Sequence, residues 1–209
     1  MRDVKAPSAR RPTLRDERAA VTRRRIADAA RRLFRRDGYA ATTLRAVAAE
    51  AGVAVQTVYA VYGSKAGILG ALREGVVSQP EAGASFEAAM AEPSAERRLA
   101  LFARSIRLRW ELTGDIVAIN EDAAMADAAI RAGVAEAVAA RWRGIARFTR
   151  AIEDDLRPGI DVERSVALVH ALTLYDLYAE LVDIHGWTPD AYESWLAAAL
   201  VREVLGTTA

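Results

Sequence analysis

Apolar residues recur every three or four positions along most of the chain. Leu99, Phe102, Ile106 and Trp110 form one such stripe, and residues 127–156 carry a longer one. This spacing places the apolar side chains on one face of a helix, and no segment shows the convincing alternation of a half-buried strand. The pattern therefore predicts an all-α protein.

Glycine, proline and capping residues divide the second half of the chain into helices. Gly114-Asp115 is predicted to open a short helix, and residues 162–185 are predicted to form one unusually apolar helix. Thr188-Pro189-Asp190 supplies a cap with proline at the first helical position, so a last helix should follow it to about Leu205.

The last two of these helices are more apolar than a small domain requires. A helix that is hydrophobic around most of its surface must be buried on several sides. We therefore expect a homodimer that pairs these two helices across a four-helix interface, although a core helix without a dimer would explain the same pattern. The spare faces lie around Leu172, Tyr175, Ala179, Trp195, Ala199 and Arg202.

Shorter helices are predicted in the first third of the chain. Thr13 or Thr22 can cap a first helix that ends at Gly38. Thr43 is placed to cap a short second helix, and Gly52 follows where a helix can end in a left-handed residue.

A third short helix starts near Ala54. Its leading end carries Val55, Gln56 and Thr57, where a recognition helix meets base edges in the major groove. Ser64 then caps a fourth helix that runs to about Val77. Residues 42–65 therefore have the pattern of a helix-turn-helix.

Charge separates the two parts of the chain. The net charge of +1 conceals 15 Lys or Arg against 6 Asp or Glu in residues 1–65, which leaves 14 against 22 in residues 66–209. A basic segment joined to an acidic remainder suggests that the first part faces a polyanion, although a solvated arginine-rich tail accounts for part of the excess.

One set of residues in the first third of the chain has a restrictive order and spacing. Its members are Ile26, Ala30, Leu33-Phe34, Gly38-Tyr39, Thr42-Thr43-Leu44, Val47-Ala48, Ala51-Gly52-Val53, Thr57-Val58-Tyr59, Tyr62-Gly63-Ser64-Lys65 and Ile68-Leu69. Together they resemble the DNA-binding domain of the tetracycline-repressor (TetR) family. The resemblance implies a cytoplasmic transcriptional regulator, usually a repressor. Such a protein binds a palindromic operator as a dimer and releases it when a small molecule occupies the C-terminal domain.

The resemblance also implies roles for individual residues. Thr43, Tyr59 and Lys65 match positions that typically hold phosphates, whereas Arg45, Val55 and Gln56 match positions that read bases. The chain departs from the family at Ala60 and Val61, where larger side chains are common. Base reading is therefore expected to depend on Arg45 and Gln56.

Side-chain chemistry supports this division. Arg45 can pair with guanine, Gln56 with adenine, and Val55 can touch a thymine methyl group. Tyr59, Tyr62 and Lys65 can donate to phosphates, which fixes register without reading sequence, and Tyr62 can equally pack in the core. Further arginines that could contact DNA as a basic arm, or remain solvated, are Arg10, Arg11, Arg15 and Arg18.

Aromatic and polar residues on otherwise apolar segments suggest a ligand pocket in the second part of the chain. A small-molecule site is usually lined by aromatic side chains with a few fixed polar groups. We expect a small apolar or aromatic effector, although each of these residues can also be ordinary core. The candidates are Trp110, Asn120, Trp142, Phe148, His170, Tyr175 and Tyr178.

Other function classes find little support. The chain has no cysteine and only two histidines, His170 and His185, so no catalytic triad or metal-spaced set appears, and we expect no enzyme, cofactor or metal. No uncharged run approaches the roughly 18 residues of a membrane helix, which favours a soluble cytoplasmic protein. A DNA-binding architectural protein, or a regulator controlled by a partner without a small-molecule inducer, remains an alternative.

The expected layout has four parts. Residues 1–18 form a disordered basic arm, residues 19–65 the helix-turn-helix domain, residues 66–80 a connecting helix, and residues 81–209 a helical regulatory and dimerisation domain.

Overall fold

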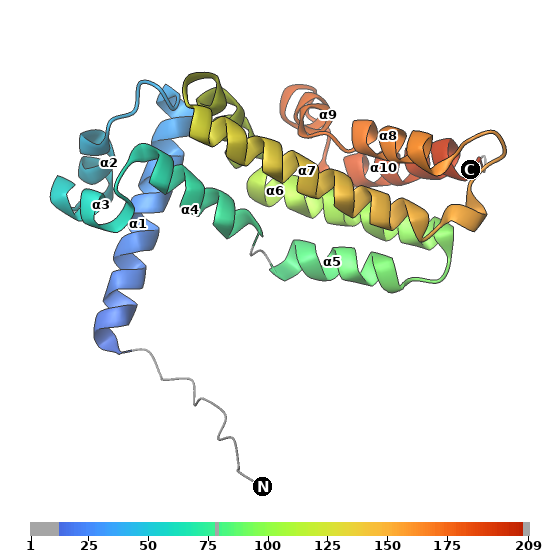
Figure 1. Ribbon diagram of the computed structural model, residues 1–209, viewed down its shortest axis with the longest axis horizontal. Coiled ribbons are helices and arrows are strands. Elements are labelled where there is room, and N and C mark those ends of the chain that lie inside the picture. The colour runs from blue at the N-terminus through green and yellow to red at the C-terminus, as the bar shows by residue number, and fades with distance from the viewer. Residues whose placement is uncertain (1–12, 78–79, 207–209) are drawn as a thin grey trace, which may run out of the picture. The chain divides into compact units, whose positions relative to one another are not determined.

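The structure, a computed structural model, describes residues 13–77 and 80–206. This part of the chain consists of helices joined by turns and loops (Figure 1). Within those ranges no strand occurs, and the predicted all-α class with an N-terminal helix-turn-helix is confirmed. The chain divides into two compact units, Met1–Leu69 and Gly70–Ala209. The division falls inside α4 (Lys65–Val77), the helix expected to connect the two domains.

Three helices build the N-terminal unit around one small core. These are α1 (Leu14–Asp37), α2 (Leu44–Ala51) and α3 (Val55–Tyr62), and the first turns of α4 complete the unit. Tyr39 packs back onto α1, with its ring centroid 5.2 Å from that of Phe34. The buried apolar side chains are Ile26, Ala29, Ala30, Leu33, Phe34, Tyr39, Val47, Ala48, Ala51, Val58, Ile68 and Leu69.

The start of α1 corrects the predicted arm. Residues 14–18, expected to be disordered, are the first helical residues, because Thr13 and Asp16 form a reciprocal capping box. The Thr13 backbone N–H donates to the Asp16 carboxylate at 2.9 Å, and this hydrogen bond lowers the pKa of Asp16. Arg15 and Arg18 therefore project from a helix, whereas Arg10 and Arg11 lie outside the described residues.

Gly52 makes the turn of the helix-turn-helix. Its φ of 64° is left-handed, and the Val53 and Gly52 amides close back on the carbonyls of Ala48 and Ala49 at 3.0 and 3.1 Å. These two bonds define a Schellman motif. Arg25 of α1 stabilises the same turn, because its Nη2 donates to the Ala51 carbonyl at 2.7 Å.

Replacing Gly52 with alanine is expected to destabilise the N-terminal unit by about 1–2 kcal/mol, because the left-handed conformation is unfavourable for a residue with a Cβ. A Cβ here would also stand 2.9 Å from Arg25 Nη2. Hydrogen exchange of the Val53 amide measures the effect. The control is Gly144→Ala, where a Cβ meets nothing within 4 Å; equal protection in both variants would contradict the assignment.

The C-terminal unit is a bundle around one long helix. α6 (Ala95–Ala126) contacts α5 (Pro80–Ala91), α7 (Ala128–Arg150), α9 (Tyr175–Tyr178) and α10 (Pro189–Val204), while α8 (Val162–Leu172) packs on α7 and α10 (Figure 1). A short 3-10 turn, Glu153–Asp155, and a π-helical turn, Ala179–Ile184, complete the unit. Thr188 caps α10, with Pro189 in its first turn, as predicted.

Gly114 does not begin a new helix, contrary to the sequence prediction. It lies inside continuous α6, whose helix runs on to Ala126. A Cβ at this position would stand 2.1 Å from Cε2 of Tyr175. The glycine therefore serves packing, because it lets the Tyr175 ring lie directly against the backbone of α6.

Three other predicted boundaries also differ from the structure. The helix expected over residues 127–156 ends at Arg150, where Arg98 Nη1 donates to the next carbonyl, that of Ala151, at 2.6 Å. The segment predicted as one helix over 162–185 breaks after Leu172 and bends by 46°. The connecting helix expected over residues 66–80 ends earlier, since α4 ends at Val77 and α5 begins at Pro80.

No single helix in the described ranges is long and apolar enough to cross a membrane. Two bent pairs of helices, α2 with α3 and α8 with Tyr175–Ile184, reach the required length and apolar character only when the two helices of a pair are taken together.

Candidate nucleic-acid interface

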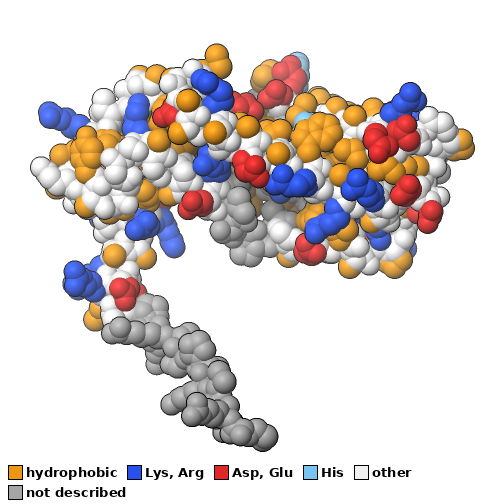
Figure 2. Space-filling model, in the orientation of Figure 1, with side chains coloured by type: hydrophobic (Ala, Val, Ile, Leu, Met, Phe, Trp, Pro, Cys, Tyr) orange, Lys and Arg blue, Asp and Glu red, His pale blue; other side chains and the backbone are white. Residues whose placement is uncertain are grey.

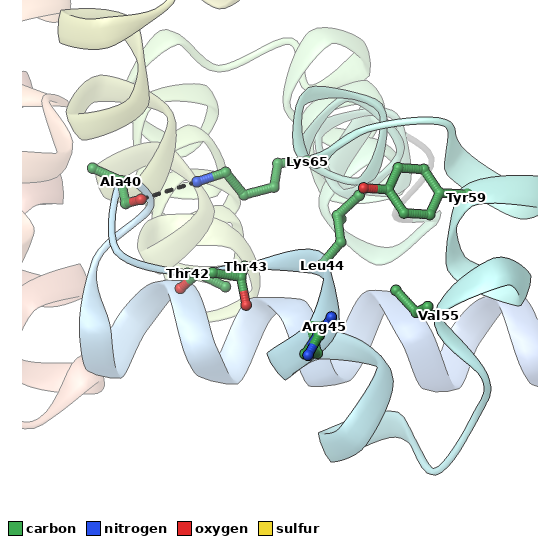
Figure 3. Close-up of a pocket in the computed structure, with 8 residues that line it drawn as sticks. All are labelled: Ala40, Thr42, Thr43, Leu44, Arg45, Val55, Tyr59 and Lys65. Atoms are coloured by element: carbon green, nitrogen blue, oxygen red, sulfur yellow. Dashed lines mark hydrogen bonds between the residues drawn. The ribbon is translucent and has the colours of Figure 1, made fainter.

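An open concavity of about 480 Å³ lies on the helix-turn-helix (Figure 3). The loop before α2, the start of α2, the exposed side of α3 and the first residue of α4 supply its walls. Five of the eight predicted DNA-binding residues line it: Thr43, Arg45, Val55, Tyr59 and Lys65. Ala40, Thr42 and Leu44 complete the lining.

Two residues at the start of α2 present polar groups to this concavity. The Thr43 Oγ1 accepts from the Ala46 amide at 3.1 Å, which caps the helix as predicted. A hydroxyl that accepts in a cap still has its own proton to donate. Arg45 is exposed, and within the described part of the chain its guanidinium has no hydrogen-bond or ion-pair partner.

Lys65 is held in place by the loop that precedes α2. Its Nζ donates to the carbonyl of Ala40 at 3.1 Å (Figure 3). It also donates to the carbonyl of Tyr39 at 2.7 Å and stands 4.5 Å from the centroid of the Tyr39 ring. Burial lowers the pKa of Lys65. An ammonium has three donors, so this fixed group keeps one N–H for an anion.

The recognition helix α3 presents its predicted residues at different depths. Tyr59 is 56% exposed, Gln56 is exposed at the leading end, and Val55 is half-buried against the concavity. Thr57 is half-buried and does not line it. Ala54 provides no side-chain cap, so the first amides of α3 are left for solvent or an anion.

Tyr62 does not line the concavity and contacts α1 instead. Its hydroxyl donates to the Arg23 carbonyl of α1 at 2.9 Å, and the Arg23 guanidinium lies 5.6 Å from the centroid of its ring. Burial raises the pKa of this phenol. These contacts hold α3 against α1, which is the packing role that the sequence left open for Tyr62.

Sequence reasoning missed Ala40, Thr42 and Leu44 as wall residues. Thr42 is buried, with its hydroxyl donating to the Gly38 carbonyl at 2.8 Å, so it shapes the loop. Only the position of these residues beside Thr43 could have indicated them.

Among the charged side chains on the visible face of the N-terminal unit most are basic, whereas the C-terminal unit shows both signs mixed (Figure 2). This distribution follows the charge division found in the sequence.

Three of the predicted ligand-pocket residues gather in the C-terminal unit. The ring centroids of Trp110 and Tyr175 are 5.6 Å apart, and those of Tyr175 and Tyr178 are 6.3 Å apart. Tyr178 packs edge-on against Tyr192 at 4.9 Å. These four rings join α6, α9 and α10.

The other pocket candidates lie in different surroundings. Phe148 is fully buried and stacks on Phe102 with centroids 4.2 Å apart, so it belongs to the core. Asn120 bonds the Ile116 carbonyl at 2.7 Å and accepts from Arg73.

Trp142 and His170 form a separate stack on α7 and α8, with centroids 4.1 Å apart and Trp142 38% exposed. Burial and the charge of Arg141 lower the pKa of His170.

Comparison with known proteins identifies the N-terminal part. Residues 26–72 match the family model of bacterial regulatory proteins, tetR family. This range contains α2, α3 and every residue that lines the concavity. The segment is a tetR-family DNA-binding domain, and the chain has the fold of the transcriptional regulators of that family. Among curated proteins, none shows significant similarity to the chain.

Solved structures share the whole fold at low sequence identity. NalD of Pseudomonas aeruginosa, the secondary repressor of the MexAB-OprM multidrug efflux pump, is 23% identical with a TM-score of 0.69, over 90% of this chain and 98% of its own. SmeT in complex with triclosan is 21% identical with a TM-score of 0.69, over 88% and 92%. FadR of Bacillus subtilis with stearoyl-CoA is 18% identical with a TM-score of 0.67, over 86% and 98%.

Proposed function

We propose that this protein is a ligand-responsive transcriptional repressor. It binds a palindromic operator as a homodimer and releases the operator when a small apolar or aromatic molecule occupies the C-terminal unit. A regulator of chromosomal genes acts in the cytoplasm and needs no catalytic group, so we propose that location and no enzymatic activity.

The observation that carries the proposal is the concavity itself. Thr43, Tyr59 and Lys65 offer donors suited to phosphate oxygens, and they line the same concavity as Arg45 and Val55, which are suited to base edges. Gln56 stands exposed at the leading end of the same recognition helix. Binding in a major groove requires phosphate-binding side chains close to base-reading ones, because phosphates flank the base edges on both sides.

The homodimer is proposed through the region of the last two helices. Ala199 is buried within the chain's own core, so that part of the predicted face is already occupied. Leu174, Ile184 and Trp187 remain 37%, 69% and 37% exposed along the broken segment and the approach to α10. Exposed apolar side chains in such number favour a protein interface, and a second copy of the chain is the occupant that a palindromic operator requires.

The salt dependence of DNA binding tests this function. If each protomer neutralises about four phosphates, the slope of log affinity against log salt is expected to be near −7, since each phosphate contributes about −0.9. The duplex is one selected by the protein from random sequences, and its consensus should be palindromic. A slope shallower than about −3, or a consensus without two-fold symmetry, would contradict the proposal.

A further inference from the structure

Arg141 lies within the C-terminal unit without an acidic partner. Its Nη2 donates to the carbonyl of Thr173 and, at 2.6 Å, to the Thr173 hydroxyl, while its guanidinium stands 5.2 Å from the centroid of the Trp110 ring. Burial and the neighbouring charge of Arg109 lower the pKa of Arg141 to about 10. At this pKa Arg141 stays protonated at neutral pH, and the like charge of the exposed Arg109 side chain acts on it.

Three acidic groups around this cluster already have partners, and one of them, Asp183, accepts from the Tyr175 hydroxyl at 3.4 Å. Glu111 and Glu193 both pair with Arg107, at 2.7 and 2.6 Å. Across the described ranges, no carboxylate forms a salt bridge with Arg109 or Arg141. Nε and Nη1 of Arg141 also lack a hydrogen-bond partner there, so their N–H groups are left to donate to a ligand. Even a half-buried positive charge costs free energy when no anion meets it, so an anionic ligand would be favoured here.

Two further donors in the same region are unsatisfied. Trp110 Nε1 and the Tyr192 hydroxyl are buried and have no hydrogen-bond partner among the described residues. Trp110 carries the ring beneath the Arg141 guanidinium, and the Arg141 charge also acts on Tyr192. Burial raises the pKa of Tyr192, so its hydroxyl keeps its proton. An unpaired buried donor costs free energy, which an incoming acceptor would recover.

The surroundings of these donors are aromatic. The rings of Trp110, Tyr175, Tyr178 and Tyr192 follow one another at 5.6, 6.3 and 4.9 Å between centroids. Tyr175 is half-buried on the four-residue helix α9, beside the π-helical turn, so it forms the outer side of this aromatic group. Such turns occur often at functional sites.

We propose that this cluster binds the carboxylate of a small aromatic acid. The carboxylate accepts from the remaining N–H groups of Arg141, from Trp110 Nε1 and from the Tyr192 hydroxyl, and the charge of Arg109 adds to the attraction. The aromatic body lies among the tyrosine rings. The proposal rests on the proposed function and deepens it, because it makes the effector an anion. The site is also placed to transmit binding, since Arg141 holds Thr173 at the break between α8 and α9.

Naphthoate and its neutral analogue naphthamide test the site on the full-length protein by titration calorimetry. Naphthoate is expected to bind about tenfold or more tightly than naphthamide, as charge-assisted hydrogen bonds require. Arg109→Gln should remove most of this preference, and Arg109→Lys, which keeps the charge, should retain part of it. Arg109 is exposed, and its side chain holds no other element in place, so both variants should fold.

Arg141→Gln is the second variant, checked by circular dichroism because this side chain also anchors Thr173. Loss of the carboxylate preference in a folded Arg141→Gln protein supports the site. Equal affinity for the two probes, no binding of either probe, or a preference that survives both glutamine variants overturns it.

Operator release separates this site from the proposed function. Naphthoate that binds without releasing the operator leaves the anion site standing and contradicts the ligand response at this site. Release by an uncharged molecule, in a protein that does not bind naphthoate, overturns the anion site and leaves the repressor function intact.

Discussion

Alanine at Arg45 or Gln56 is expected to relax the preference for one base pair in each half-site, at a cost of about 1–3 kcal/mol per base pair. Both side chains are exposed on the helix-turn-helix, and a bidentate contact to one base is lost with the side chain. Lys65→Ala is expected to weaken binding to all sequences alike and to make the salt slope shallower, because a phosphate contact carries no sequence information. Selection from random duplexes, followed by affinity measurements on single-base variants, measures both effects.

Lys65 requires a control for folding. Its Nζ bridges two carbonyls of the loop before α2, so Lys65→Ala also removes a structural contact. Melting of the variant without DNA separates the two contributions. If Arg45→Ala and Lys65→Ala both weaken every sequence equally, the division into base readers and phosphate anchors is wrong.

Phe148→Ala is expected to destabilise the C-terminal unit by about 3–5 kcal/mol, because it opens a cavity in a well-packed core. The Phe148 ring is fully buried, stacks on Phe102 and lies 6.3 Å from the centroid of Phe86. Urea unfolding followed through signals of this unit measures the loss, since a chain of two units need not unfold in one step.

Trp142→Ala provides the matched comparison. This ring is 38% exposed and stacks only on His170 among the aromatic side chains of the described region, so a smaller loss of stability is expected. If Phe148→Ala proves nearly neutral for stability and instead abolishes binding of an effector, the ring belongs to the ligand pocket that the sequence predicted.

The N-terminal unit could be predicted in detail because its signals are local. Thr13, Thr43, Gly52 and Ser64 cap or end helices through contacts within a few residues, and a cap acts on its own helix wherever that helix packs. The place of Lys65 at the start of α4 could be predicted in the same way. Its hydrogen bonds to the Tyr39 and Ala40 carbonyls could not, because these residues lie 26 and 25 positions away in the sequence and meet Lys65 only after folding.

The C-terminal unit was predicted less well because there the decisive contacts are long-range. Gly114 carries an ordinary signal for a helix boundary, yet the ring of Tyr175 packs on it and the helix continues. The apolar segment over 162–185 reads as one helix, but Arg141 meets its backbone at Thr173, where it breaks. Spacing along the chain contains no information about either neighbour.

By itself, the sequence determined the all-α class, the helix-turn-helix with its caps, and the separation of a basic segment from an acidic one, because periodicity, capping and charge are properties of the chain read in order. Only the tertiary structure decided which aromatic side chains are core and which gather around Arg141. That choice depends on which helices pack together, and it left Trp110 Nε1 and the Tyr192 hydroxyl buried beside an unpaired cation.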